Sequence, residues 1–180
     1  MGRLIYLVGA SGVGKDTLLA ATRQRYPEWL VAHRYVTRES GASENSVALT
    51  PEEFLARQRA GLFALSWEAH GLHYGLGVEL DAWLARDRVV LVNGSRRALP
   101  SARARFGAAL APVVMTAADQ VLRARLRRRG REGEAEIEAR LARHRELRDA
   151  LPEVPRLDNG GPLDGTLVAL ERLVDGEVMA

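Results

Sequence analysis

Short apolar runs alternate along the chain with longer stretches in which apolar residues recur at helical spacing. The runs lie at 3–8, 31–37, 88–92, 111–115 and 154–158. The stretches with helical spacing lie at 14–25, 51–60, 78–86, 118–129, 133–149 and 162–174. Compact runs of this length are typical of strands that are buried on both faces. The alternation predicts one α/β domain, in which helices cover both faces of a doubly wound, mostly parallel sheet of about five strands.

Two segments depart from this alternation. Residues 38–46 are polar, and we expect a loop there. Residues 62–77 are rich in glycine and aromatic side chains, and we expect irregular structure. The helix between them has a clear start, because Thr50 is a favourable N-cap, Pro51 takes the first helical position and Glu53 the third.

A glycine-rich segment joins the first predicted strand to the first predicted helix. It reads Gly9-Ala10-Ser11-Gly12-Val13-Gly14-Lys15-Asp16-Thr17, which matches the phosphate-binding pattern G-x-x-x-x-G-K of P-loop NTPases. The glycines leave backbone N–H groups free to surround a polyphosphate at the helix N-terminus, and Lys15 can reach the β- and γ-phosphates. A glycine-rich turn without a ligand is the alternative, but the strand, the helix and the lysine in register favour an ATP site at 9–17.

The position after Lys15 is unusual. The pattern normally ends in Ser or Thr, whose hydroxyl binds Mg²⁺, whereas this chain has Asp16. Mg²⁺ prefers hard oxygen ligands, so Asp16 is the predicted metal-binding residue, directly or through water. Its charge is favoured by the helix dipole and opposed by the phosphates.

Composition supports the P-loop and narrows the class of protein. Lys15 is the only lysine, so 25 of the 26 basic residues are arginine, and the single compact ammonium group stands where a polyphosphate is expected. With no cysteine, a disulfide framework, a thiolate metal site and a cysteine nucleophile are excluded. No apolar run approaches the roughly 20 residues of a membrane span, and a strand at the very start leaves no room for a signal peptide, so we expect a cytoplasmic protein without membrane contact.

Arginines crowd one part of the chain. They are Arg123, Arg125, Arg127, Arg128, Arg129 and Arg131, followed by Arg140, Arg143 and Arg145. A solvated helix face is the simplest interpretation, and nucleic-acid binding is disfavoured by the lack of interleaved aromatic residues and by a net charge of only +3. A third interpretation is a lid that brings arginines onto the phosphates of ATP, and the P-loop upstream favours it.

These motifs together resemble the guanylate kinase branch of the nucleoside monophosphate kinases. The lid pattern R-L-x-x-R-G-x-E, then I-x-x-R-L, is matched from Arg125 to Glu132 and from Ile137 to Leu141. The acceptor elements T-T-R and Y-G are matched by Val36-Thr37-Arg38 and Tyr74-Gly75. The resemblance implies that Arg125, Arg129 and Arg140 contact ATP and the transferred phosphoryl group. It also implies a single kinase domain, 1–180, with a core at 1–36, 87–122 and 150–180, an acceptor-binding segment at 37–86 and a lid at 123–149.

The departures from guanylate kinases concern the recognition of the base. A second phosphate-binding arginine is replaced by Gly41, and the glutamate that reads the guanine edge is replaced by Leu65. A tyrosine that holds the acceptor phosphate is missing around Ser46, and an acidic residue gives way to Asn93. Sites that depend on hydrogen bonds to a base lose discrimination of roughly 10⁴–10⁵ when the partner is absent. The chain is therefore expected to select GMP poorly.

A second family combines this phosphate machinery with the loss of base reading. The chain resembles the ribose 1,5-bisphosphate phosphokinases of bacterial phosphonate catabolism in Gly14-Lys15-Asp16, in 63–67, in 69–75 and in Val92-Asn93-Gly94-Ser95-Arg96. The resemblance implies transfer of the γ-phosphoryl group of ATP, with Mg²⁺, to the 1-phosphate of ribose 1,5-bisphosphate, giving ADP and 5-phosphoribosyl 1-diphosphate. The predicted contacts to the sugar bisphosphate are Arg38, Tyr74, Asn93, Ser95 and Arg96, although Tyr74 can equally pack and Asn93 can equally turn the chain.

Three alternatives remain open at this point. A guanylate or other nucleoside monophosphate kinase is the nearest, and strong GMP turnover would identify it. A non-catalytic binding module of the same fold is disfavoured because Lys15 and the lid arginines are present. A nucleic-acid-stimulated ATPase would show steeply salt-dependent DNA or RNA binding, which we do not expect. The sequence leaves the oligomeric state open, a homodimer included.

Overall fold

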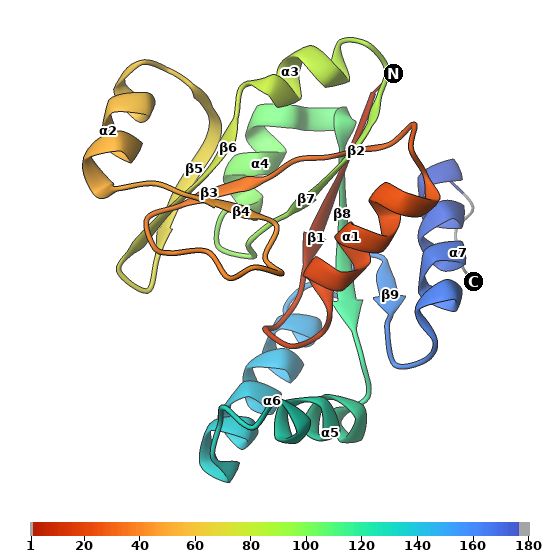
Figure 1. Ribbon diagram of the computed structural model, residues 1–180. Helices are drawn as coiled ribbons and strands as arrows, with labels where there is room; N and C mark the ends of the chain where they lie inside the picture. Colours follow the sequence, from red (N-terminus) through yellow and green to blue (C-terminus); the bar gives the residue numbers. More distant parts are fainter. Residues whose placement is uncertain (1, 177–180) are drawn as a thin grey trace.

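The computed structural model describes residues 2–176, which form two sheets surrounded by helices (Figure 1). The larger sheet has five strands in the order β2-β7-β1-β8-β9, and every neighbouring pair is parallel. Its strands are β1 Arg3–Val8, β2 Leu30–Val31, β7 Val89–Asn93, β8 Leu110–Thr116 and β9 Arg156–Asp158. The predicted parallel α/β fold is confirmed.

The larger sheet is buried on both faces, as its apolar runs predict. Along β1, Ile5 and Leu7 point into one hydrophobic cluster, whereas Leu4 and Tyr6 point into the other, because successive side chains of a strand face opposite ways. The helices α1 Lys15–Arg25 and α7 Leu163–Asp175 cover the first face. The helices α3 Glu79–Leu84 and α4 Leu99–Phe106 cover the second (Figure 1). The apolar pattern predicted no element at α4.

The smaller sheet corrects the first expectation. Residues 62–77 are not irregular: β5 Phe63–Ala69 and β6 Leu72–Gly77 form an antiparallel hairpin. The hairpin turns at His70 and Gly71, whose φ angles of 53° and 72° are those of a tight type I′ turn. Glycine and aromatic residues had suggested a loop, but here the glycine makes the turn and the aromatic residues pair across the strands.

The second correction concerns the single strand predicted at 31–37. The chain splits there into β2, in the larger sheet, and β3 Arg34–Val36, in the smaller one. Asn45 lies between the two strands. Its side-chain amide donates to the carbonyl of Ala32 at 2.7 Å, and its backbone carbonyl accepts from the backbone N–H of Arg34 at 3.2 Å. The split therefore depends on a residue outside the apolar run. β4 Ser46–Ala48 follows and pairs with β3, completing the order β4-β3-β6-β5.

One helix covers the outer face of the smaller sheet. It is α2 Pro51–Arg59, and its predicted cap is confirmed, because the hydroxyl of Thr50 accepts from the backbone N–H of Glu53 at 3.1 Å. Phe54 of this helix stacks on Phe63, with ring centroids 4.5 Å apart. A bulge between Phe63 and Leu65 separates these two side chains, so that Phe63 meets α2 while Leu65 packs into the core.

Two consecutive helices project from the carboxyl end of the larger sheet. They are α5 Asp119–Arg129 and α6 Glu134–Asp149, and they hold the arginine-rich segment (Figure 1). Buried leucine and isoleucine side chains join them to the cluster beneath α1: Leu122, Leu126, Ile137 and Leu141. A short 3₁₀ turn, Gly107–Ala109, precedes β8. Within residues 2–176, none of the helices combines the length and the apolar character needed to cross a membrane.

Candidate active site

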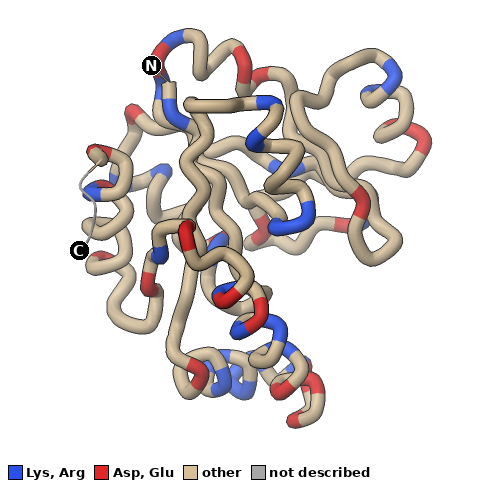
Figure 2. The backbone as a smooth tube through the Cα atoms, turned by 180° about the vertical axis from the view of Figure 1, so that it is seen from behind, with Lys and Arg blue, Asp and Glu red and all other residues tan. Residues whose placement is uncertain are grey.

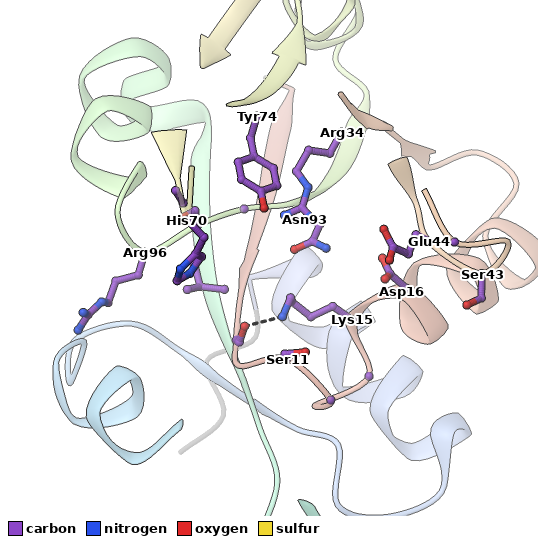
Figure 3. A pocket seen from close by; sticks show the side chains of 18 of the residues that line it. Ser11, Lys15, Asp16, Arg34, Ser43, Glu44, His70, Tyr74, Asn93 and Arg96 are labelled. Carbon is purple, nitrogen blue, oxygen red and sulfur yellow. Dashed lines mark hydrogen bonds between the residues drawn. The ribbon is translucent and has the colours of Figure 1, made fainter. Parts of the chain in front are cut away.

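A cavity of about 930 Å³ lies between the two sheets, at the carboxyl ends of β1 and β7 (Figure 3). In parallel sheets this edge is where ligands bind. The residues predicted for ATP, Mg²⁺ and substrate that line the cavity are Gly9, Ser11, Gly12, Gly14, Lys15, Asp16, Thr17, Arg38, Tyr74, Asn93, Ser95, Arg96 and Arg129. Two predicted P-loop residues do not line it, Ala10 and Val13, the latter being buried in the core.

The P-loop has the backbone shape that its glycines permit. Gly12 and Gly14 have φ angles of 91° and 99°, a region that other residues rarely adopt. A Cβ atom on Gly14 would lie 2.6 Å from the side-chain nitrogen of Asn159, which follows β9. That nitrogen donates to the carbonyl of Val13 at 2.8 Å, and the oxygen of the same amide accepts from Thr166 at 2.8 Å. Asn159 thus supports the loop, a role that only its place after a strand could have suggested.

Lys15 folds back over its own loop. Its ammonium group donates to the carbonyl oxygens of Gly9 and Ala10, the latter at 3.1 Å (Figure 3). Burial, together with the nearby charge of Arg34, lowers the pKa of Lys15 to about 8, and the charge of Asp16 opposes both. A phosphate beside this ammonium group would favour its charged form.

Asp16 connects the P-loop to the smaller sheet. Its carboxylate accepts from the backbone N–H of Asn45 at 3.3 Å, and it lies beside Glu44 in the cavity (Figure 3). Glu44 is engaged by Arg38, whose guanidinium nitrogen is 2.8 Å from it. Among the described residues there is no group of three or more side chains able to hold a metal ion. An ion here would need ligands from the nucleotide and water, which is how Mg²⁺ usually binds.

The loop after β7 is held by a buried tyrosine. The hydroxyl of Tyr6 accepts from the backbone N–H of Ser95 and donates to its carbonyl, both at 2.9 Å. Burial raises the pKa of Tyr6 to about 12, so the phenol stays neutral. A Cβ on Gly94 would lie 2.2 Å from the tyrosine ring, so only glycine allows this approach. The contact fixes the loop that carries Ser95 and Arg96 at the cavity.

The cavity also contains side chains that the sequence did not suggest. Arg34 lies over the ring of Tyr74, with its guanidinium carbon 4.8 Å from the ring centroid, and Tyr74 in turn stacks on Trp67 at 5.6 Å. The hairpin turn brings His70 to the cavity, and Arg97 lines it too. Strand alternation would have predicted Trp67 and Tyr74 on one face, had the hairpin been identified.

Leu65 does not line the cavity. Its side chain is 6% exposed and packs in the cluster that includes Tyr6. Gly41, where guanylate kinases carry a second arginine, does line it. Both observations fit a site in which no side chain reads a purine edge from these positions.

The lid arginines divide between two hollows. Arg125 lies in a second hollow of about 370 Å³ beside the P-loop, together with Arg128 and Arg129. Its guanidinium group donates to the carbonyls of Asn159 at 2.6 Å and Val13 at 3.4 Å. Arg140 lines neither hollow, because it forms an ion pair with Glu132 at 3.1 Å.

The arginines of the lid fall into two groups, those that form ion pairs between α5 and α6 and those that face the hollows. Those that pair across α5 and α6 are Arg123 with Glu138, Arg127 with Glu134 and Arg145 with Asp119. Figure 2 shows basic and acidic positions close together on these helices. Within the lid segment, 123–149, the arginines that form no ion pair and line the hollows are Arg125, Arg128, Arg129 and Arg131. This division favours a solvated face for the first group and a lid over phosphates for the second.

Comparisons with known proteins agree on the fold and on the family. No protein-family model matches the chain. A ribose 1,5-bisphosphate phosphokinase PhnN of Pectobacterium parmentieri is 50% identical over 177 residues, covering 97% of this chain and 94% of that protein. The protein of the same name from Pantoea vagans is 51% identical over 180 residues, covering 97% and 98%.

Solved structures of similar fold are more distant in sequence. A guanylate kinase from Anaplasma phagocytophilum superimposes with a TM-score of 0.72 at 17% identity, covering 99% of this chain and 87% of that one. A gluconokinase from Sinorhizobium meliloti has a TM-score of 0.52 at 18% identity, covering 97% and 94%. The fold is therefore that of guanylate kinase, and the sequence relatives decide the family within it. The chain belongs to the ribose 1,5-bisphosphate phosphokinase family, PhnN.

Proposed function

We propose that the chain transfers the γ-phosphoryl group of ATP to the 1-phosphate of ribose 1,5-bisphosphate, forming ADP and 5-phosphoribosyl 1-diphosphate in phosphonate degradation. The observation that carries this proposal is that the P-loop and all the predicted acceptor contacts, from Arg38 to Arg96, line one cavity. The similar proteins of Pectobacterium and Pantoea bear the name of this activity.

The donor half of the reaction is assigned to the P-loop and the lid. In this proposal the backbone N–H groups of 9–17 surround the phosphates of ATP, and Lys15 neutralises charge on the transferred group. The lid supplies Arg125, Arg129 and Arg140, of which Arg140 must first leave Glu132. Asp16 fits a metal held mainly by nucleotide phosphates and water, and bound Mg²⁺ would supply charge neutralisation on those phosphates.

The acceptor half needs no general base. An oxygen of the 1-phosphate is already ionised at neutral pH, and it attacks the γ-phosphorus while the bond to the bridging oxygen of ADP breaks. Catalysis then consists of alignment and charge neutralisation. A sugar bisphosphate requires cationic and hydrogen-bonding partners, and the cavity provides Arg38, Tyr74, Asn93, Ser95 and Arg96.

The chief alternative acceptor is a nucleoside monophosphate such as GMP. The base-reading glutamate of guanylate kinases is replaced by Leu65, whose side chain is buried in the core and cannot accept a hydrogen bond. Discrimination by such bonds is worth roughly 10⁴–10⁵. We therefore propose weak turnover of GMP and no nucleic-acid partner, with the reaction in the cytoplasm, where ATP is available.

The decisive experiment offers both acceptors side by side. ADP release is measured with Mg-ATP and either ribose 1,5-bisphosphate or GMP, and the products are identified by phosphorus NMR. We expect rapid turnover of the sugar with a new pyrophosphate linkage. Preferential turnover of GMP would refute the proposed acceptor and would mean that the site reads guanine with other residues.

A further inference from the structure

Arg34 is a cation in the cavity that forms no ion pair, although the charges of Asp16 and Glu44 act on it from farther away. It stands at the start of β3, where strand alternation sends Arg34 toward Tyr74 and the cavity, and Tyr35 toward Phe63 beneath α2. In residues 2–176 its guanidinium group makes no hydrogen bond or ion pair, and its Nε atom is buried without any partner. Burial lowers the pKa of Arg34, which means that its positive charge is unfavourable in this position without a ligand.

Its neighbour Arg38, by contrast, has its guanidinium group engaged by other residues. Arg38 forms an ion pair with Glu44 at 2.8 Å and donates to the carbonyl of Glu39 at 2.8 Å. By the resemblance to guanylate kinases, a second arginine is expected three residues after Arg38, but this chain has Gly41 there. The acceptor side therefore has one arginine engaged by a carboxylate and one, Arg34, that is available.

Arg34 and Lys15 enter the same cavity from two walls, one from β3 and the other from the P-loop (Figure 3). Each is a partly buried cation, and Arg34 acts on Lys15 strongly enough to lower its pKa. Two like charges that face a shared space are stabilised by an anion between them. Because Lys15 is at the donor phosphates, this anion would be the acceptor phosphate that attacks them.

A second unpartnered atom indicates what accompanies that phosphate. The side-chain oxygen of Asn93 is buried without a hydrogen-bond donor among the described residues, and Asn93 lines the same cavity. Arg34 lacks an acceptor and Asn93 lacks a donor. A ligand with a phosphate next to a hydroxyl group supplies both, and a ribose 1-phosphate has a hydroxyl on the adjacent carbon.

We propose that Arg34 binds the attacking phosphate of the acceptor and supplies the cation that the chain lacks at Gly41, while Asn93 accepts a hydrogen bond from the adjacent ribose hydroxyl. This inference rests on the proposed function for the identity of the sugar. Tyr74 acts as a positioning residue, because its ring supports the guanidinium group at 4.8 Å.

The test compares Arg34→Met and Arg34→Lys with a matched control, Arg57→Met. Arg57 also lies over a tyrosine, 5.2 Å from the ring of Tyr35, but on the α2 side and outside the cavity. We expect Arg34→Met to raise the KM for ribose 1,5-bisphosphate about 10- to 100-fold, as loss of a charged hydrogen bond implies. The KM for ATP should stay within about threefold, Arg34→Lys should recover part of the loss, and Arg57→Met should match the wild type.

The possible failures are distinguishable. If the wild type forms 5-phosphoribosyl 1-diphosphate and Arg34→Met leaves the acceptor KM unchanged, or raises both KM values equally, the role of Arg34 is overturned and the function stands. If the wild type does not turn over the sugar, the proposed function fails. Calorimetric binding of inorganic phosphate to the ADP-bound protein then tests Arg34 directly: about tenfold weaker binding in Arg34→Met supports it as a phosphate ligand, and equal binding overturns it.

Discussion

The donor and acceptor sides of the cavity are built in different ways. The donor side comes from consecutive residues, 9–17, and its polar groups are engaged: Lys15 by its own loop, Asp16 by Asn45, and the loop carbonyl of Val13 by Asn159. The acceptor side comes from β3 and the loop after it, from the β5–β6 hairpin, and from the end of β7 with the loop that follows. There, Arg34 and Asn93 each keep a buried polar atom without a partner.

The difference indicates where ligand chemistry is specified. A loop whose shape is fixed by its own contacts is preorganised, and its free backbone N–H groups can serve any nucleoside triphosphate, because phosphate binding does not read the base. Buried polar atoms without partners are unfavourable until a ligand supplies the missing donor or acceptor. We therefore expect the acceptor side to be the part of the molecule that distinguishes this family from guanylate kinases.

The largest effect is expected on the donor side. Lys15→Ala should reduce ADP release by about 10³-fold or more, since it removes the only lysine and its charge at the transferred phosphoryl group. Circular dichroism and thermal unfolding should show that the fold is retained. Near-normal turnover in this variant would contradict the role of the P-loop, and the contrast between the donor and acceptor sides would then have no basis.

The second effect concerns the apolar cluster that contains Leu65, beside the acceptor side. Leu65→Glu should lower the free energy of unfolding by about 3 kcal/mol, because it places a carboxylate in the apolar cluster around Tyr6. The control is Leu62→Glu, since Leu62 is 46% exposed and should tolerate the change. Urea unfolding measures both. Strong GMP turnover by Leu65→Glu would show instead that position 65 reaches the cavity and can read a base.

The third prediction weakens the link between the two sides, although the bond from the backbone N–H of Asn45 to Asp16 is kept. Asn45→Ala removes the bond that its side-chain amide donates to the carbonyl of Ala32 and the bond that its side-chain oxygen accepts from Arg23, and should cost about 1–3 kcal/mol of stability. Because β3 is then held less firmly relative to the P-loop, the KM for the sugar should rise more than the KM for ATP. Equal changes in the two KM values would mean that Asn45 serves the donor side as well.

The smallest effect is a pH dependence. Folding lowers the pKa of Lys15 from 10.5 to about 8, so between these values the unfolded chain holds more protons than the native one. Stability should therefore rise with pH across this window, by about 1 kcal/mol for a group that is only half-buried. Below pH 8, Lys15 is protonated in both the native and the unfolded chain, and the full cost of burying its charge lowers the stability of the native state. Urea midpoints of the wild type and Lys15→Met should converge toward pH 10.5, and a constant difference would contradict the lowered pKa.

The sequence was most informative where function is local. The P-loop could be found because strand, glycine turn and helix are contiguous, and the confirmed cap of Thr50 has the same cause. The arginine spacing in 123–140 pointed to a lid, although it could not show that Arg123 and Arg127 pair with α6 while Arg125 contacts Asn159. Those partners depend on how two helices meet.

The smaller sheet shows the opposite case. Glycine and aromatic residues at 62–77 are compatible with both a loop and a hairpin, and the positive φ angles of His70 and Gly71 come from cross-strand pairing. The split of 31–37 between two sheets depends on Asn45, which the apolar pattern does not identify.

By itself, the sequence determined the parallel α/β core and the nucleotide loop, because both follow from periodicity and from neighbouring residues. Tertiary structure alone decided that Arg34 faces Tyr74 while Tyr35 faces α2, and that Asn93 is buried at the cavity. The physical reason is that strand register and burial are set by contacts between distant segments, and the acceptor site consists of such contacts.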